Sequence, residues 1–427
     1  MRRLVVLTIV LLVAGSAKSH DLHKDACNQI TRSNLVSCVL SASLKTREGD
    51  AAEEAIRGRQ DAVSAWLPSN PVVSLAGAQR EGPSGNATFT NWYVTLAQEL
   101  EIAGQQAVRG QAVGYELRAQ QERRQALQRD IAVQAWRVYF EAIAASEGLT
   151  LARKLEIIHA HIAEVTHTRV TQGLNAQVDA SLADASKIRA TQLRMEAEHT
   201  QHTALAMLHM LYGRDPLSKL LDMQAGTLTP LHIAEKLSQN TSAIAFLDQP
   251  EVEALYSDQR AYETHAAAFR RARIPNPTLS GFIQKDGFDE TVLGLGLSFP
   301  ITLPRPIGRS YSGEEIQAIA RSKELSLERQ EQMREQRLEL ATARMEFFTR
   351  QRQVEEFAPE LIKQTHSTLD AIAEEIQRGH LAARDALSLH QKLVDVLLND
   401  VSTRLALALA SVRLARAAGG ALERGEQ

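Results

Sequence analysis

The residues of this chain that could do chemistry are its thirteen histidines, two cysteines and a few carboxylates near glycines. Imidazole is the commonest metal ligand in proteins, so the closely spaced histidines come first. His159 and His161 are two residues apart in a helical pattern and point to different faces, whereas His199 and His202 are three apart and could share a face. No carboxylate-rich or cysteine-containing cluster accompanies either pair. We therefore expect exposed helix positions and no metal site.

Motifs for catalysis are also missing from the sequence. It contains no Gly-x-Ser-x-Gly, no phosphate-cradling glycine-rich loop and no His-Glu-x-x-His. The net charge of -3, from 48 basic and 51 acidic residues, lacks the basic excess that nucleic-acid-binding proteins usually carry. We therefore expect a protein that is not an enzyme, needs no cofactor and binds no nucleic acid.

The first residues predict export from the cytoplasm. Two arginines precede an apolar run from Leu4 to Ala14, and Gly15 to Ala17 form a small-residue cleavage site, so a signal peptide over 1–17 is expected. No cysteine follows closely enough for a lipid anchor. In an oxidising compartment Cys27 and Cys38 could form a disulfide, and the alternative is two unpaired small residues.

Beyond this signal, no uninterrupted apolar stretch reaches the roughly 18 residues that a spanning helix needs. The two best candidates, 131–145 and 393–415, are both interrupted by charged residues. If the protein crosses a membrane, we expect it to do so as strands. Aromatic residues are only 5% of the chain, and Ala, Gln, Glu, Arg and Leu dominate much of it, which is typical of long helices.

The chain contains an internal repeat. The segment from Asn70 to Ser74 recurs from Asn276 to Ser280, an offset of 206 (276 − 70). The segment from Gly173 to Ala180 recurs from Gly379 to Ala386 with the same offset, 379 − 173 = 206. Two landmarks about a hundred residues apart that share one offset indicate a duplicated architecture.

Each half predicts a β-hairpin after its Asn-Pro, since short strand-like runs flank a polar or glycine-rich turn. The expected strands are about 72–80 and 90–100 in the first half and 278–285 and 291–299 in the second.

The last strand has the clearest pattern, because four large apolar residues alternate with small ones: Leu293, Leu295, Leu297 and Phe299. This period favours a membrane strand with aliphatic groups toward lipid, while an ordinary half-buried hairpin is the alternative. Four aromatic residues could form an interfacial girdle: Phe89, Trp92, Tyr93 and Phe288.

Long helices are expected between and after the hairpins. The first half predicts helices over about 105–170 and 176–211, and the second over about 314–378, kinked at Pro359, and 382–418. At 1.5 Å per residue, about 65 helical residues would reach roughly 100 Å, a length suited to crossing the periplasm. Apolar positions recur at coiled-coil-like spacing.

Four strands cannot close a barrel, yet a sheet in lipid must close so that every backbone polar group is paired. Eight strands enclose an interior filled by side chains, whereas about twelve leave a bore. We therefore expect a trimer.

These features together resemble the TolC-like outer-membrane efflux proteins, over about residues 50–418. The resemblance lies in the duplicated Asn-Pro strand openings, in the segment Gln98 to Gly104, and in Leu297 to Ile301. It is closest to the heavy-metal branch, the outer components of cobalt-zinc-cadmium and copper-silver exporters. Where that branch commonly has proline after the glutamine, this chain has Glu99.

The resemblance implies a mainly α fold with a β-barrel: a homotrimer whose 12-stranded barrel sits in outer-membrane lipid and continues into a periplasmic α-helical barrel. It implies no catalysis but two protein partners, a periplasmic adaptor (membrane fusion) protein and an inner-membrane resistance-nodulation-division pump. The adaptor would meet the helix tips at Gly173 and Gly379. Arg169 matches a basic residue before the first tip, and Glu375 holds the equivalent place in the second.

Asp179 and Asp385 lie six residues past the two tip glycines. In the family the second of these can face the lumen at the periplasmic entrance, where three copies would form a cation-attracting ring. The alternative is a carboxylate that stabilises a helix N-terminus, which is favoured for Asp179.

The expected organisation is a signal peptide (1–17), an N-terminal segment (18–50), two repeats (51–246 and 247–418) and a tail (419–427). The expected function is the exit duct of a tripartite proton-driven efflux system, exporting heavy-metal cations. The alternatives are a duct for drug efflux or type I protein secretion, and a periplasmic coiled-coil structural protein without a pore.

Overall fold

The computed structural model describes residues 27, 31–81, 88–215, 226–232, 234, 249–285, 290–301, 307, 310–378, 380–420 and 422. The expected signal peptide, Phe288 and Gly379 lie outside these residues, as does the side chain of Phe89. In the part of the chain so described, no helix combines the length and apolar character needed to cross a membrane.

The two halves of the chain share one plan, in which a helical segment, a hairpin, a long helical stretch and a second long helix follow one another. The first contains α2 (Leu35–Ala42), α3 (Leu44–Ser64), β1 (Val72–Glu81), β2 (Thr88–Glu99), α4 (Gln105–Thr171) and α5 (Gln177–Leu211). The second contains α7 (Pro250–Arg271), β3 (Thr278–Lys285), β4 (Thr291–Ser298), α8 (Ser312–Glu355), α9 (Pro359–Arg378) and α10 (Ala383–Ala417). Both expected hairpins and all the expected long helical stretches are therefore present.

One expectation about the helices is wrong. Pro359 was expected to kink a single helix over 314–378, but α8 ends at Glu355 and a separate helix, α9, begins at the proline. Proline has no N–H to donate to the preceding turn and its ring clashes with the carbonyl four residues earlier, so it suits the first position of a helix better than the interior. The N–H of Leu361 then bonds the carbonyl of Ala358 at 2.8 Å to start α9.

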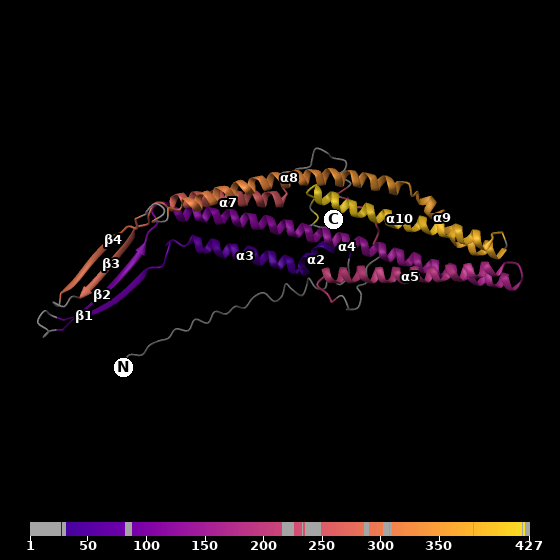
Figure 1. The fold of residues 1–427 in the computed structure, drawn as a ribbon, viewed down its shortest axis with the longest axis horizontal. Coiled ribbons are helices and arrows are strands. Elements are labelled where there is room, and N and C mark those ends of the chain that lie inside the picture. The colour runs from indigo at the N-terminus through magenta and orange to yellow at the C-terminus, as the bar shows by residue number, and fades with distance from the viewer. Residues whose placement is uncertain are drawn as a thin grey trace. The chain divides into compact units, whose positions relative to one another are not determined.

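The strands form one antiparallel sheet in the order β1-β2-β3-β4, and Figure 1 shows the four side by side. β1 pairs with β2 and β3 with β4 as hairpins. The pairing of β2 with β3 runs from Trp92 opposite Lys285 to Glu99 opposite Thr278. The sheet is therefore continuous across the two halves of the chain.

The chain divides into two compact units that cut across its halves. One unit consists of Leu44–Gln128 and Ile244–Ala341, and it holds the sheet with α3 and α7. The other consists of Met1–Ser43, Arg129–Ala243 and Thr342–Gln427, and it holds α5, α9 and α10. Each unit thus takes segments from both repeats.

In the second of these units, aliphatic side chains from α4, α5, α9 and α10 form two buried clusters. Their buried members are Leu151, Leu155, Leu369, Val394 and Leu397 in one, and Ile162, Ala163, Val165, Ala183, Ile372, Ile376, Ala386 and Leu387 in the other. The helices therefore pack through seams of the kind that the coiled-coil spacing predicts.

The N-terminal segment is fastened to this same unit. A disulfide joins Cys27 to Cys38, whose Cα atoms are 5.7 Å apart. Between the two cysteines in sequence, the guanidinium of Arg32 lies over the rings of Trp136 and Phe140, with its Cζ at 5.7 and 5.8 Å from the ring centroids. Both rings are buried, so this cation–π contact packs the N-terminal segment against the helical core.

Candidate functional site

One face of the sheet is aliphatic across all four strands. The register places Leu75, Val94, Ile283 and Leu293 in one row, because each is the direct partner of the next. Leu293 and Leu295 are 79% and 85% exposed. The exposed large apolar residues of this face are Val73, Leu75, Trp92, Leu96, Leu279, Ile283, Leu293, Leu295 and Leu297. A continuous exposed patch of this size marks a surface that contacts something apolar.

The opposite face of the sheet carries mostly small and polar groups, with four larger apolar or aromatic side chains among them: Val72, Tyr93, Phe282 and Val292. Along the same ladders it presents Ser74, Ala76, Ala78, Asn91, Thr95, Ala97, Ser280, Gly294, Gly296 and Ser298. The ring of Phe282 lies across Gly294, since a Cβ at that glycine would have three ring atoms within 3.0 Å. A Cβ at Gly296 would meet the Ser280 Oγ at 2.6 Å. Close cross-strand packing therefore requires both glycines.

Two of the four residues expected in an aromatic girdle, Trp92 and Tyr93, lie on opposite faces of the sheet. Trp92 lies in the ladder row of Lys285 on the aliphatic face, whereas Tyr93 lies in the row of Ala76 and Gln284 on the small-residue face. Successive residues of a strand point to opposite faces, so these neighbours cannot share one side of the sheet.

Where the strands meet the helices, the second Asn-Pro motif connects the two halves. The Asn276 Nδ2 donates to the Glu99 Oε1 at 2.8 Å, and the Gln105 Nε2 donates to the Asn276 Oδ1 at 2.8 Å. The Leu100 N–H also bonds the Pro277 carbonyl at 2.9 Å. Glu99, which departs from the heavy-metal pattern, is therefore a hydrogen-bond acceptor at the strand–helix junction. In the sequence Asn276 marks the start of the second repeat, but nothing near it predicts its hydrogen bond to Glu99.

The first tip, between α4 and α5, is a glycine turn stabilised by polar side chains. Gly173 has a φ of +75°, and the N–H of Leu174 bonds the Arg169 carbonyl at 2.9 Å, a helix C-terminus that favours glycine. The Arg169 Nε donates to the Asn175 Oδ1 at 2.9 Å. The Asp179 carboxylate accepts from the Ala176 N–H at 3.3 Å. Asp179 therefore caps α5.

The second tip, between α9 and α10, has different chemistry. The Glu375 carboxylate pairs with the His380 Nδ1 at 3.0 Å and with Arg378 at 3.3 Å. Asp385 is exposed in the first turn of α10, and within the described residues no hydrogen bond or ion pair involves its side chain. The equivalent aspartates are thus used differently, one as a cap and one facing solvent.

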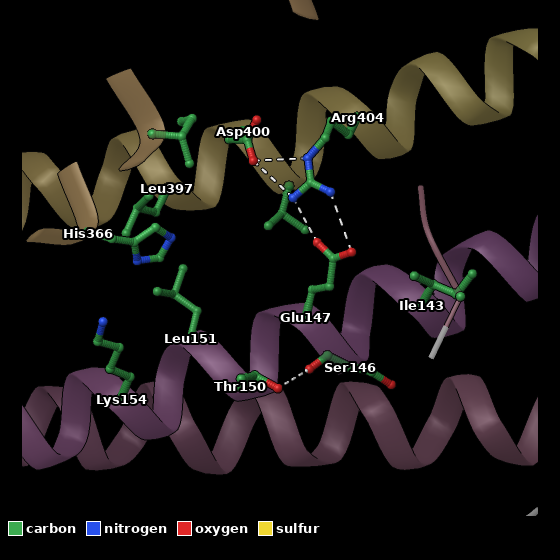
Figure 2. A pocket seen from close by; sticks show the side chains of 13 residues that line it. Ile143, Ser146, Glu147, Thr150, Leu151, Lys154, His366, Leu397, Asp400 and Arg404 are labelled. Atoms are coloured by element: carbon green, nitrogen blue, oxygen red, sulfur yellow. Dashed lines mark hydrogen bonds and ion pairs between the residues drawn. The ribbon is translucent and has the colours of Figure 1, made fainter. Parts of the chain in front are cut away.

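A cavity of about 450 Å³ lies between α4, α9 and α10. Figure 2 shows Glu147, Asp400 and Arg404 at one end and Lys154 with His366 at the other. The Arg404 guanidinium pairs with Glu147 at 2.7 Å and with Asp400 at 2.9 Å. A single guanidinium thus bridges two carboxylates, one from each helix, across the seam. Among the described residues that line the cavity, no nucleophile is paired with a base.

The four closely spaced histidines do not all lie where the sequence predicts. His161, His199 and His202 are exposed on their helices, as expected. His159 was also expected to be an exposed position but is half-buried, because its ring packs 4.2 Å, centroid to centroid, from that of the fully buried His390. Sequence reasoning did not single out His390. Within the described ranges, no group of three or more His, Cys, Asp and Glu side chains could hold a metal ion.

Comparison with known proteins relates this geometry to a fold. No protein-family model and no curated protein matches the chain. Among solved structures, the Campylobacter jejuni CmeC outer membrane channel matches with a TM-score of 0.75 and 16% identity, over 92% of this chain and 86% of that one. The open state of the Neisseria gonorrhoeae MtrE outer membrane channel matches at 0.71 and 18%, over 92% and 90%. CusC, whose structures describe transmembrane channel formation, matches at 0.73 and 16%, over 91% of each chain. The chain therefore has the fold of outer-membrane channels.

Proposed function

We propose that this chain is one protomer of a homotrimeric outer-membrane duct, the exit component of a tripartite proton-driven efflux system in a Gram-negative bacterium. The observation that carries the proposal is the exposed aliphatic face that runs in register across all four strands. Aliphatic groups on one face and small groups on the other suit strands with lipid on one side and a lumen on the other. The fold shared with outer-membrane channels supports the same conclusion.

The trimer follows from the edges of the sheet. β1 and β4 are its edge strands, and within the described residues each pairs on one side only. In lipid an unpaired edge is costly, so the edge of one protomer must meet that of the next. Three copies would supply about twelve strands, the smallest shared barrel here that leaves a bore.

The tips are proposed to meet a periplasmic adaptor protein that links the duct to an inner-membrane resistance-nodulation-division pump. Next to Gly173, the side chains of Leu174 and Val178 are 62% and 66% exposed, which suits an apolar docking contact. The polar pairs of the two tips differ, with Arg169 and Asn175 at one and Glu375 and His380 at the other. We therefore expect the adaptor to contact the two tips through different side chains.

We propose heavy-metal cations as the transported substrate, and drugs or secreted proteins are the alternatives. Three copies of the exposed Asp385 would form an acidic ring at the periplasmic entrance, whose field would concentrate cations. The heavy-metal character of the strand motifs supports the same class. Deleting the gene and measuring growth on cobalt, zinc, cadmium, nickel, copper, silver, dyes and antibiotics tests this assignment. Sensitivity confined to the organic compounds would refute it and leave the duct intact.

The duct itself is tested by purification. The protein should fractionate with outer membranes, require detergent for extraction, and show the mass of three chains by native mass spectrometry. A detergent-independent monomer would refute the proposal and favour a periplasmic coiled-coil structural protein instead.

A further inference from the structure

Where α4 packs against α10, two histidines face each other, and the proposed duct function does not explain this contact. His159 of α4 and His390 of α10 meet edge to face, with their ring planes at 73°. The layers on either side of this pair are aliphatic: Leu155 and Ile162 on α4, and Leu387 and Val394 on α10. Two imidazoles thus occupy positions where neighbouring layers bury hydrocarbon.

Three of the four ring nitrogens of this pair are buried without a hydrogen-bond partner. His390 is fully buried and neither of its ring nitrogens has a hydrogen-bond partner, and the Nδ1 of His159 is also buried without one. Every neutral imidazole carries one N–H and one lone pair, so burying both unpaired costs free energy. Leucine at either position would avoid that cost. A merely structural role therefore gives no reason for histidine here.

Charge on either ring would be costly in this layer. Burial lowers the pKa of His159, and burial together with the neighbouring His159 lowers the pKa of His390 to about 4. On the elements around the pair, Glu156 is already bound to Arg194 at 2.7 Å, Lys154 and His366 line the cavity, and Lys392 and Asp395 are exposed. None of these groups contributes to the pKa of either histidine.

We propose that His159 and His390 form a proton-sensitive joint in the α4–α10 seam, packed while both rings are neutral and loosened once either takes up a proton. In a loosened seam the ring of His390 would regain its ordinary pKa of about 6.5, so the loosened form binds the proton more tightly. The packing free energy is complete above about pH 6.5 and falls as the pH drops toward about 4.

For His390 alone, this linkage raises the population of the loosened form on the order of 100-fold between pH 8 and pH 4.5. The joint lies on the helix that begins at the second tip and also carries Asp385. Loosening would therefore act on the helix that leads to the proposed entrance of the duct.

Hydrogen exchange on the full-length protein in detergent tests the joint, at pH 8 and pH 4.5, with exchange times scaled for the intrinsic effect of pH. Peptides covering 153–165 and 386–397 should exchange at least about ten times faster at the lower pH. His390→Leu should greatly reduce the response, and the double variant His159→Leu/His390→Leu should abolish it. His159→Leu serves as a further variant if His390→Leu does not fold. The matched control, His199→Leu on the exposed face of α5, should keep the response.

A wild-type protein whose scaled exchange does not change with pH would overturn the joint, and so would a response that is undiminished in the variants that lack these histidines. Conductance in planar bilayers separates this inference from the proposed function. Pore formation with a pH response that His390→Leu reduces would support both. A seam that loosens in a protein that forms no pore would refute the duct and leave the joint standing.

Discussion

Gly294 of β4 lies beneath the ring of Phe282 of β3, and replacing this glycine with alanine tests the packing of the small-residue face. The new methyl group would have three ring atoms within 3.0 Å, well inside the ordinary contact distance of about 3.5–4.0 Å. The ring must swing away and lose its place over the strand. Overpacking of this kind costs about 1–3 kcal/mol.

Two further variants separate this clash from a general effect of alanine. Gly281→Ala changes a glycine on the aliphatic face of the same sheet, where the added Cβ would meet a Leu295 methyl at an ordinary 3.7 Å. We expect this control to be neutral or to stabilise the strand by up to about 1 kcal/mol, since alanine is better than glycine in a strand interior. In the double variant Phe282→Ala/Gly294→Ala, the second substitution should cost less than it does alone, because the ring is no longer there to displace.

The assay is guanidinium unfolding of the protein in phospholipid vesicles, followed by tryptophan fluorescence. The unfolding midpoint of Gly294→Ala should fall below those of the wild type and of Gly281→Ala. If Gly294→Ala and Gly281→Ala unfold at the same midpoint, the packing of Phe282 on Gly294 does not stabilise the sheet. Strict additivity in the double variant would also refute the clash with the ring.

If the aliphatic face lies in lipid as proposed, Leu295→Lys should lower the stability of the sheet by about 2–4 kcal/mol and reduce the folded yield in outer membranes, measured by heat-modifiable electrophoretic mobility. Replacing Cys27 and Cys38 with serine opens a loop with a sequence separation of 11 and should cost about 3 kcal/mol, read as a lower melting temperature that reductant no longer affects. Asp385→Asn should reduce the cation preference of single channels in planar bilayers, and unchanged selectivity would remove the acidic ring. Asp179→Asn should instead leave selectivity alone and destabilise α5 by up to about 1 kcal/mol in thermal unfolding.

The hairpins and long helices were predictable because their signals are local. The alternation around Leu295 repeats every two residues, so the predicted β4 lies within one residue of its observed bounds. The Asn-Pro before β3 and the polar turn after it predicted the bounds of that strand correctly. The first long helix was expected to 170 and runs to Thr171, just before the glycine turn that ends it. The disulfide was left open in the sequence, because spacing alone does not establish that two cysteines pair.

The remaining features depend on which distant residues meet. Nothing within the segment 386–394 indicates that His390 faces His159, because the packing of α10 on α4 determines that contact. The bond from Asn276 to Glu99 likewise exists only once the two halves pair. At Pro359 the sequence marked the right residue, but whether a proline bends a helix or ends it depends on how the flanking turns pack.

The ladder between β2 and β3 has a consequence for biogenesis. Glu99 pairs with Thr278, which is 179 residues further along the chain (278 − 99). If the chain is exported from its N-terminus, as its first residues predict, the first hairpin arrives long before the strand that must cover its inner edge, and non-local pairings of this kind form slowly. During that interval an aliphatic strand with unpaired backbone groups is exposed to water, the condition that favours aggregation. Translocation of the proposed duct would therefore require holding chaperones until the second hairpin arrives.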